Sequence, residues 1–157
     1  MRLRKRHNKG FSLVELLIVV AVIAILVSVV GAYLFKYIKK SKISHDISNA
    51  DTIANAAITA LKEQDINNEV RLKGGLEAIA LPDGTFTSTT DAPLFLSALN
   101  QYCGSAPKMK YTDEGQEAWQ VKVDAGATTV EVWTTDVAGT FYVGRLTPDP
   151  NGCYTGY

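Results

Sequence analysis

The sequence predicts an α+β protein in which one long amino-terminal helix packs on a small antiparallel β-meander. Three observations lead to this prediction. Residues 16–35 form a run of 20 residues without a charge. Apolar residues then recur at helical spacing as far as residue 61, and alternating strand patterns are confined to the carboxyl-terminal third. The chain has 157 residues, enough for about one domain.

The first ten residues are strongly basic. They hold five of the 16 Lys and Arg residues, and the first acid is Glu15. A helix of about 20 residues measures about 30 Å, the thickness of the hydrocarbon core of a bilayer. The apolar run is therefore predicted to span a membrane, with the basic leader in the cytoplasm and the rest of the chain outside. A secretory signal peptide would have a shorter apolar core and a small-residue cleavage site, and neither is found here.

A compact motif stands where the leader meets the apolar run, and it reads Gly10-Phe11-Ser12-Leu13-Val14-Glu15. With the basic leader before it and the apolar helix after it, this motif resembles the class III signal of type IV pilins and pseudopilins. The resemblance covers roughly residues 1–62. It implies that a prepilin peptidase cleaves between Gly10 and Phe11 and methylates the new amino group of Phe11. It also implies that the apolar helix is kept after cleavage.

Glu15 places a carboxylate at the edge of an apolar tract, where an unpaired charge is costly. One interpretation is that Glu15 lies close enough to the lipid headgroups to stay hydrated. The resemblance implies another role, in which the carboxylate pairs with the amino group of Phe11 from the same or a neighbouring subunit. In the low dielectric of a filament core, that pair would set the register of assembly.

The helix is predicted to continue to about residue 62, now as an amphipathic helix. Its apolar stripe has spacings of three and four and consists of Ile43, Ile47, Ala50, Ala54, Ala57 and Leu61. Four charged residues are expected on the other faces: Lys42, Asp46, Asp51 and Lys62. The stripe is expected to pack against the sheet. Lys36, Lys39 and Lys40 share one face and are expected to anchor the helix at the membrane interface.

Residues 63–117 are predicted to be an irregular connector, because turn signals recur there at residues 67–68, 74–75 and 82–84. Within it, residues 92–102 are expected to form a short helix with Asp91 as its N-cap and Pro93 in its first turn. In the pilin family this region corresponds to the variable part of the head that decorates the filament surface.

Three strands are predicted at residues 119–123, 130–133 and 141–146, separated by turns at 125–127 and 136–139. The expected domain organisation is a cleaved leader (1–10), a transmembrane or filament-core helix (11–35) and an extracytoplasmic pilin-like head (36–157). Within the head, the sheet occupies residues 118–146 and an irregular tail occupies residues 147–157.

Two cysteines are too few for a disulfide-dense scaffold or a zinc-ribbon array. In an extracytoplasmic head, Cys103 and Cys153 are expected to form one disulfide that fixes the tail to the domain, contributing about 2–4 kcal/mol. The alternative is two unpaired thiols. In type IV pilins, a disulfide near the carboxyl end commonly borders an exposed loop.

The sequence does not suggest an enzyme, a cofactor or a metal centre. Its histidines are His7, in the leader, and His45, and it has no nucleophile elbow, glycine-rich phosphate loop or C-x-x-C pair. Oxygen-rich residues at Asp136, Asp149 and Asn151 are better explained as turns than as a calcium site. Without its first ten residues the chain holds 11 basic and 16 acidic residues, a net charge of −5, which disfavours broad nucleic-acid binding.

The resemblance implies a structural subunit of a type IV pilus that polymerises with other pilin subunits through its amino-terminal helix, on an assembly platform in the membrane. Such filaments serve adhesion, motility or DNA uptake, and the sequence identifies no surface or DNA ligand. The protein would be stored in the cytoplasmic membrane with its head outside and would be extracellular after assembly. Two alternatives stay open: a pseudopilin of a type II secretion or competence system, and a membrane-anchored module that never assembles.

Overall fold

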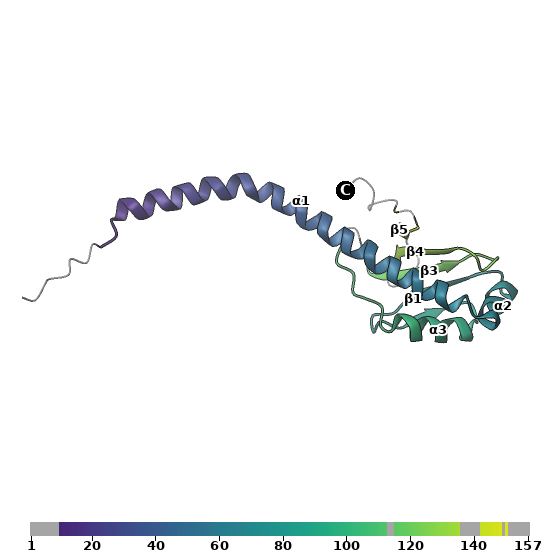
Figure 1. Cartoon of the computed structure of the whole chain (residues 1–157). Helices are drawn as coiled ribbons and strands as arrows, with labels where there is room; N and C mark the ends of the chain where they lie inside the picture. The colour runs from purple at the N-terminus through teal and green to yellow at the C-terminus, as the bar shows by residue number, and fades with distance from the viewer. Residues whose placement is uncertain (1–9, 113–114, 136–141, 149, 151–157) are drawn as a thin grey trace, which may run out of the picture. The chain divides into compact units, whose positions relative to one another are not determined.

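The computed structural model describes residues 10–112, 115–135, 142–148 and 150 (Figure 1). Within these residues lie the helices α1 (Leu13–Ala60), α2 (Gln64–Leu72) and α3 (Pro93–Cys103). The strands are β1 (Leu76–Ala80), β2 (Phe86–Ser88), β3 (Ala118–Val123), β4 (Val130–Thr135) and β5 (Tyr142–Thr147). The chain divides into two compact units, Met1–Ile38 and Lys39–Tyr157, and the second is called the head below.

Helix α1 confirms the predicted long helix and its apolar stripe. It runs without a break through Gly31 and ends close to the predicted end at residue 62. Within the head, the stripe residues Ile43, Ala50, Ala54 and Ala57 are buried, and Ile47 and Leu61 are partly buried. The buried side chains of Ile53 and Ala60 widen the stripe beyond the prediction. This face of α1 therefore forms one side of the hydrophobic core.

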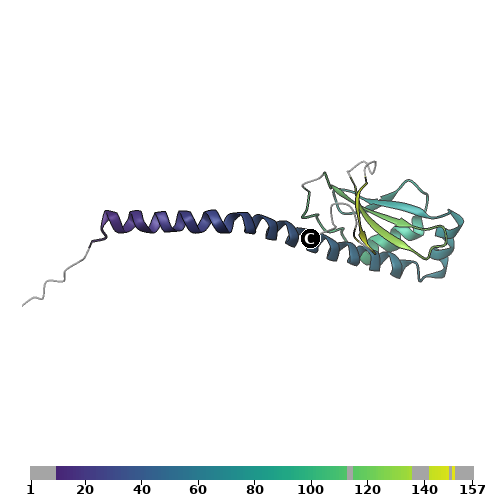
Figure 2. The same cartoon turned by 90° about the horizontal axis from the view of Figure 1, so that it is seen from above.

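The sheet supplies the other side of that core. Its described strands are all antiparallel in the order β2-β1-β3-β4-β5, and they can be followed in Figures 1 and 2. Ala78, Val121 and Val132 lie on three neighbouring strands, are fully buried and belong to the same cluster as the α1 stripe. The predicted α+β layout is confirmed, and three of the five strands match the predicted ones closely.

Two parts of the fold prediction are wrong. The described sheet has five strands where three were expected, because β1 pairs with β3 and β2 extends the sheet beyond β1. Residues 63–117 contain α2, β1 and β2 in addition to the expected helix α3. The turn signal at residues 82–84 separates the two strands of a hairpin, β1 and β2, and does not mark an irregular region.

The amino terminus of α3 is capped from outside the helix. Asp91, the predicted N-cap, instead pairs with Lys73 at 3.7 Å, and the N-cap position is Ala92, which makes no side-chain cap. The Glu69 carboxylate on α2 accepts hydrogen bonds from the backbone N–H groups of Leu94 at 3.2 Å and Phe95 at 2.9 Å. Glu69 thus satisfies two of the donors that a helix start leaves open and joins α2 to α3.

Replacing Glu69 with alanine is expected to lower the free energy of unfolding of the head by about 1 kcal/mol, the usual cost of losing a helix cap. Asp91→Ala is the matched control. Asp91 forms a long, exposed ion pair, so its loss should change stability by less than about 0.5 kcal/mol. Urea unfolding followed by tryptophan fluorescence measures both variants, because Trp119 and Trp133 both lie in the head. Equal stabilities of the two variants would contradict the assignment of Glu69 as the cap.

Candidate functional site

The first half of α1 presents a continuous apolar surface. From Leu13 to Gly31 the helix is long and apolar enough to cross a membrane, and none of that stretch is buried within the described chain. Its large apolar side chains keep 48–79% of their surface exposed. In water such a surface would be strongly unfavourable, so this stretch requires lipid or another protein surface around it.

Two shallow apolar hollows lie along this exposed stretch. The first, about 420 Å³, is lined by Leu13, Leu16, Leu17, Val20, Ala21 and Ala24. The second, about 230 Å³, is lined by Leu26, Val27, Val30, Gly31 and Leu34. A Cβ atom built on Gly31 would meet no other atom within 4 Å, so the missing side chain leaves room there. Small residues of this kind allow another helix to approach closely.

Glu15 folds back over the start of α1. Its Oε2 atom accepts a hydrogen bond from the backbone N–H of Ser12 at 3.4 Å, and the Ser12 carbonyl accepts the bond from Leu16 that opens the helix. This is half of a capping box, and it holds the carboxylate at the positive end of the helix dipole. The predicted cleavage residues Gly10 and Phe11 lie just before this turn and are exposed. The carboxylate of Glu15 is therefore presented at the end of α1 that cleavage after Gly10 would turn into the new amino terminus.

Asp46 is the residue that the sequence prediction misplaced. It was expected on a face of the helix other than the apolar stripe, but it is fully buried within the head. Its carboxylate accepts hydrogen bonds from the backbone N–H groups of Lys110 at 2.9 Å and Tyr111 at 2.7 Å. Burial raises its pKa, and these two N–H bonds partly oppose that rise.

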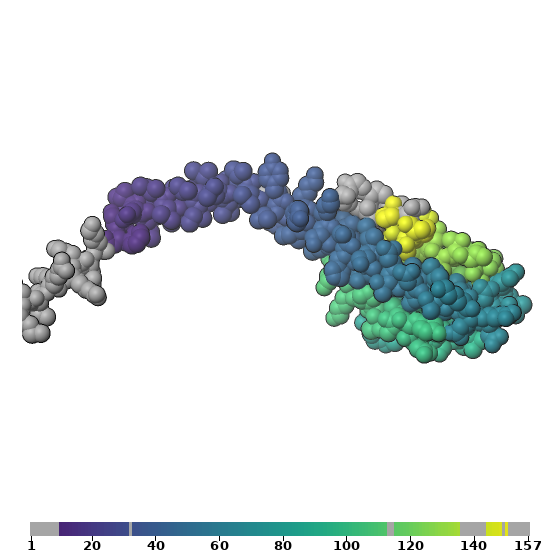
Figure 3. All heavy atoms as spheres, in the orientation of Figure 1, coloured from purple at the N-terminus to yellow at the C-terminus, as the bar shows by residue number. Residues whose placement is uncertain are grey.

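The bonds to Asp46 hold residues 104–112, here named the strap, against α1. In Figure 3 the strap, in the green part of the colour bar, lies beside the second half of α1. The spacing of the stripe could have identified Asp46 as buried, because it follows Ile43 by three positions and precedes Ala50 by four.

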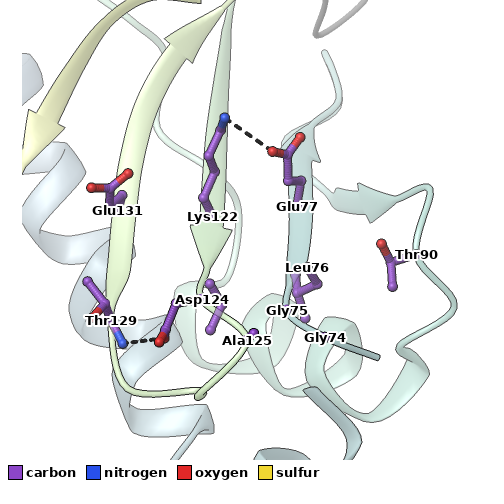
Figure 4. Close-up of a pocket in the computed structure, with 11 residues that line it drawn as sticks. Gly74, Gly75, Leu76, Glu77, Thr90, Lys122, Asp124, Ala125, Thr129 and Glu131 are labelled. Carbon is purple, nitrogen blue, oxygen red and sulfur yellow. Dashed lines mark hydrogen bonds and ion pairs between the residues drawn. The ribbon is translucent and has the colours of Figure 1, made fainter. Parts of the chain in front are cut away.

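An open, polar depression of about 600 Å³ lies at one end of the sheet, between the turn before β1 and the turn that joins β3 to β4 (Figure 4). Lys122 pairs with Glu77 at 3.1 Å across the neighbouring strands β3 and β1. Glu131 pairs with Arg145 at 2.7 Å. These charged side chains of the depression are thus already paired, and the arrangement resembles a cross-strand ladder more than a ligand site.

The β3–β4 turn that borders the depression confirms the predicted turn at residues 125–127. The Asp124 carboxylate accepts hydrogen bonds from the backbone N–H groups of Thr129, Thr128 and Gly126, and these bonds lower its pKa. Asp124 therefore closes its own turn and has few oxygen lone pairs left for a ligand.

Several predicted residues fall outside the described part of the chain. Cys103 ends α3 and is partly buried, with its pKa raised by burial, but Cys153 lies outside the described residues. The pairing of the two cysteines therefore stays a prediction. Asp136, Asp149 and Asn151 are also outside the described residues, as is the predicted turn at residues 136–139.

The comparisons with known proteins bear on the amino-terminal part of the chain. No curated protein and no solved structure matches the chain. One family model matches, described as the prokaryotic N-terminal methylation motif, and its match covers residues 5–31. Those residues include the predicted cleavage residues Gly10 and Phe11, Glu15 and the apolar stretch up to Gly31. The chain therefore carries at residues 5–31 a prokaryotic N-terminal methylation motif, the class III signal peptide of type IV pilins and pseudopilins.

Proposed function

We propose that this protein is a structural subunit of a type IV pilus that polymerises through the apolar half of α1. The observation that carries the proposal is the overlap of two features. The methylation motif covers residues 5–31, and the helix within it, Leu13–Gly31, exposes apolar side chains along its whole length. An ordinary secretory signal is discarded, whereas a class III signal leaves its apolar helix on the mature protein.

The exposed helix accounts for two states of the protein. In the stored state, lipid would surround Leu13–Gly31, since the length of this stretch fits a bilayer core. In the filament, the same stretches of neighbouring subunits would pack together, with the apolar hollows around Ala21, Ala24 and Gly31 receiving the adjoining helices. Contacts that repeat without closing on themselves generate an open filament.

Processing would prepare the subunit for this packing. Prepilin peptidase would cleave between Gly10 and Phe11 and methylate the Phe11 amino group. The new positive charge would then need a partner inside the filament. Glu15 supports this role because its carboxylate already lies at the end of α1 that carries Phe11. In this proposal the partners are other copies of the subunit, the peptidase and an assembly platform in the cytoplasmic membrane.

A pseudopilin of a secretion or competence system carries the same signal, so the decisive experiment must separate a surface fibre from a short envelope-bound one. Intact mass and amino-terminal sequencing of the protein from membranes and from a sheared surface fraction do so. Chains beginning at methylated Phe11 in both fractions are expected. Processed chains found in the membrane fraction alone would favour the pseudopilin. An intact leader in both fractions would overturn the proposal and leave a simple membrane-anchored domain.

A further inference from the structure

The head gathers lysines from two distant parts of the chain at one end. Lys39, Lys40 and Lys42 lie on the first residues of α1 within the head. Lys108 and Lys110 lie on the strap, which reaches α1 at the end of the head opposite α2 (Figure 1). These five residues are named the basic collar. The collar is therefore a product of the fold, because two of its members come from a segment more than 60 residues further along the chain.

Two contacts fix the strap lysines beside the helix lysines. The buried Asp46 carboxylate holds the backbone of Lys110 and Tyr111 against α1. The Lys39 ammonium lies 5.0 Å from the centre of the Tyr111 ring, within the range of a cation–π contact. Tyr111 itself is fully buried, so the strap has a fixed position on α1.

The collar presents positive charge to solvent. Lys40, Lys108 and Lys110 are exposed and Lys42 is partly exposed. The ion pairs among the described residues join Lys73 to Asp91, Lys122 to Glu77 and Arg145 to Glu131, and so leave these four ammonium groups without a described acidic partner. Asp113 and Glu114, which follow the strap, lie outside the described residues. Asp46, whose carboxylate binds the strap, is buried and accepts hydrogen bonds from the strap backbone.

The position of the collar along α1 indicates its partner. In the sequence, Lys39, Lys40 and Lys42 follow the membrane-spanning stretch, which ends at Gly31, by eight to eleven residues. Lysines that flank a membrane span extend their long side chains towards the phosphate groups of the lipid headgroups.

We propose that the basic collar docks the stored subunit on anionic phospholipid headgroups. The inference rests on the proposed function, because it requires the apolar stretch of α1 to lie in a bilayer. The helix lysines alone could do no more than anchor the helix. The strap lysines add a contact from the head itself, and so hold the head at the membrane surface until assembly.

The experiment uses the full-length chain, one copy per nanodisc, in discs of phosphatidylcholine alone and in discs containing phosphatidylglycerol. Lysines are acetylated with a water-soluble reagent, and mass spectrometry gives the rate at each site. Acetylation of Lys108 and Lys110 is expected to be at least threefold slower in the anionic discs, and added salt of about 0.5 M should remove the difference. Lys62, which is exposed just after α1 at the other end of the head, is the internal control and should react equally in both.

A double variant tests whether the strap contributes to docking. In Lys108→Gln/Lys110→Gln chains, the lipid-dependent protection of Lys40 and Lys42 should fall, whereas Lys62→Gln should leave it unchanged.

Equal acetylation rates in the two lipids would overturn the proposal. Discs that hold more than one copy serve as a comparison. If protection is the same in both lipids but increases with the number of copies per disc, the collar would instead bind acidic residues of a second copy. Incorporation into discs is scored first, and a chain that fails to incorporate would contradict the proposed membrane anchoring and this inference with it.

Discussion

Glu15→Gln is expected to reduce the yield of surface filaments by about a hundredfold or more while leaving membrane insertion and leader cleavage intact. Glutamine is nearly the same size as glutamate and keeps an oxygen that can accept the Ser12 N–H bond, so the start of α1 should survive. The change removes the negative charge alone. A buried Phe11 ammonium would then lack its partner, at a cost of about 3–5 kcal/mol, and each 1.4 kcal/mol corresponds to about a tenfold change in equilibrium.

Two further variants separate the charge from the cap. Glu15→Asp keeps the charge on a shorter side chain and should restore part of the assembly. Ser12→Ala keeps the backbone N–H that Glu15 binds, and should assemble almost normally. Filaments are measured as subunit recovered by shearing, and processing is measured by the mass of the membrane-bound subunit. Normal filament yields from Glu15→Gln would show that Glu15 is not the counter-charge.

The amino-terminal methylation motif could be recognised from the sequence because its information is local. Gly10, Phe11 and Glu15 lie within six consecutive positions of this motif. The apolar run beside it needs no tertiary contact to be recognised, since length and composition alone determine whether a helix can span a bilayer. The capping bond from the Ser12 N–H to the Glu15 carboxylate is also local and follows the Ser-x-x-Glu pattern.

The missed elements of the head depend on contacts between distant residues. Strand β1 buries Leu76, Ala78 and Ala80, and alanine carries little strand signal of its own. Helix α2 buries Ile66 and Val70 alone, which is too short a pattern to predict a helix. Glu69 caps a helix that begins more than 20 residues later, and Asp46 binds backbone groups more than 60 residues away. In each case a partner distant in sequence decides the structure.

Asp46→Ala is expected to cause a large loss of stability of the head. The substitution leaves the backbone N–H groups of Lys110 and Tyr111 without an acceptor in a buried site, at about 1–3 kcal/mol for each unsatisfied group. We expect a loss of about 3 kcal/mol, equivalent to a fall in Tm on the order of 10 °C. Asp51→Ala, on an exposed position of the same helix, should change stability by less than about 0.5 kcal/mol.

The pH dependence of Asp46→Asn tests the electrostatic part of this account. Burial raises the pKa of Asp46 above its ordinary value of 3.8, so the folded head binds the proton more tightly than the unfolded chain does. The stability gained in this way is fully present below the pKa that Asp46 has in the unfolded chain. It is lost as the pH rises through the pKa that Asp46 has in the folded head. Asparagine does not titrate.

The wild type should therefore gain stability relative to Asp46→Asn as the pH is lowered from neutral towards 4. The free energy of unfolding of the wild type minus that of Asp46→Asn should accordingly be lowest at neutral pH. Urea unfolding of both proteins across this pH range, followed by tryptophan fluorescence, measures that difference. A difference that shrinks on acidification would mean that the N–H bonds from Tyr111 and Lys110 outweigh desolvation and that the pKa is lowered. The Asp46 carboxylate would then be a favourable anchor for the strap in its charged form, and its burial would cost the head little.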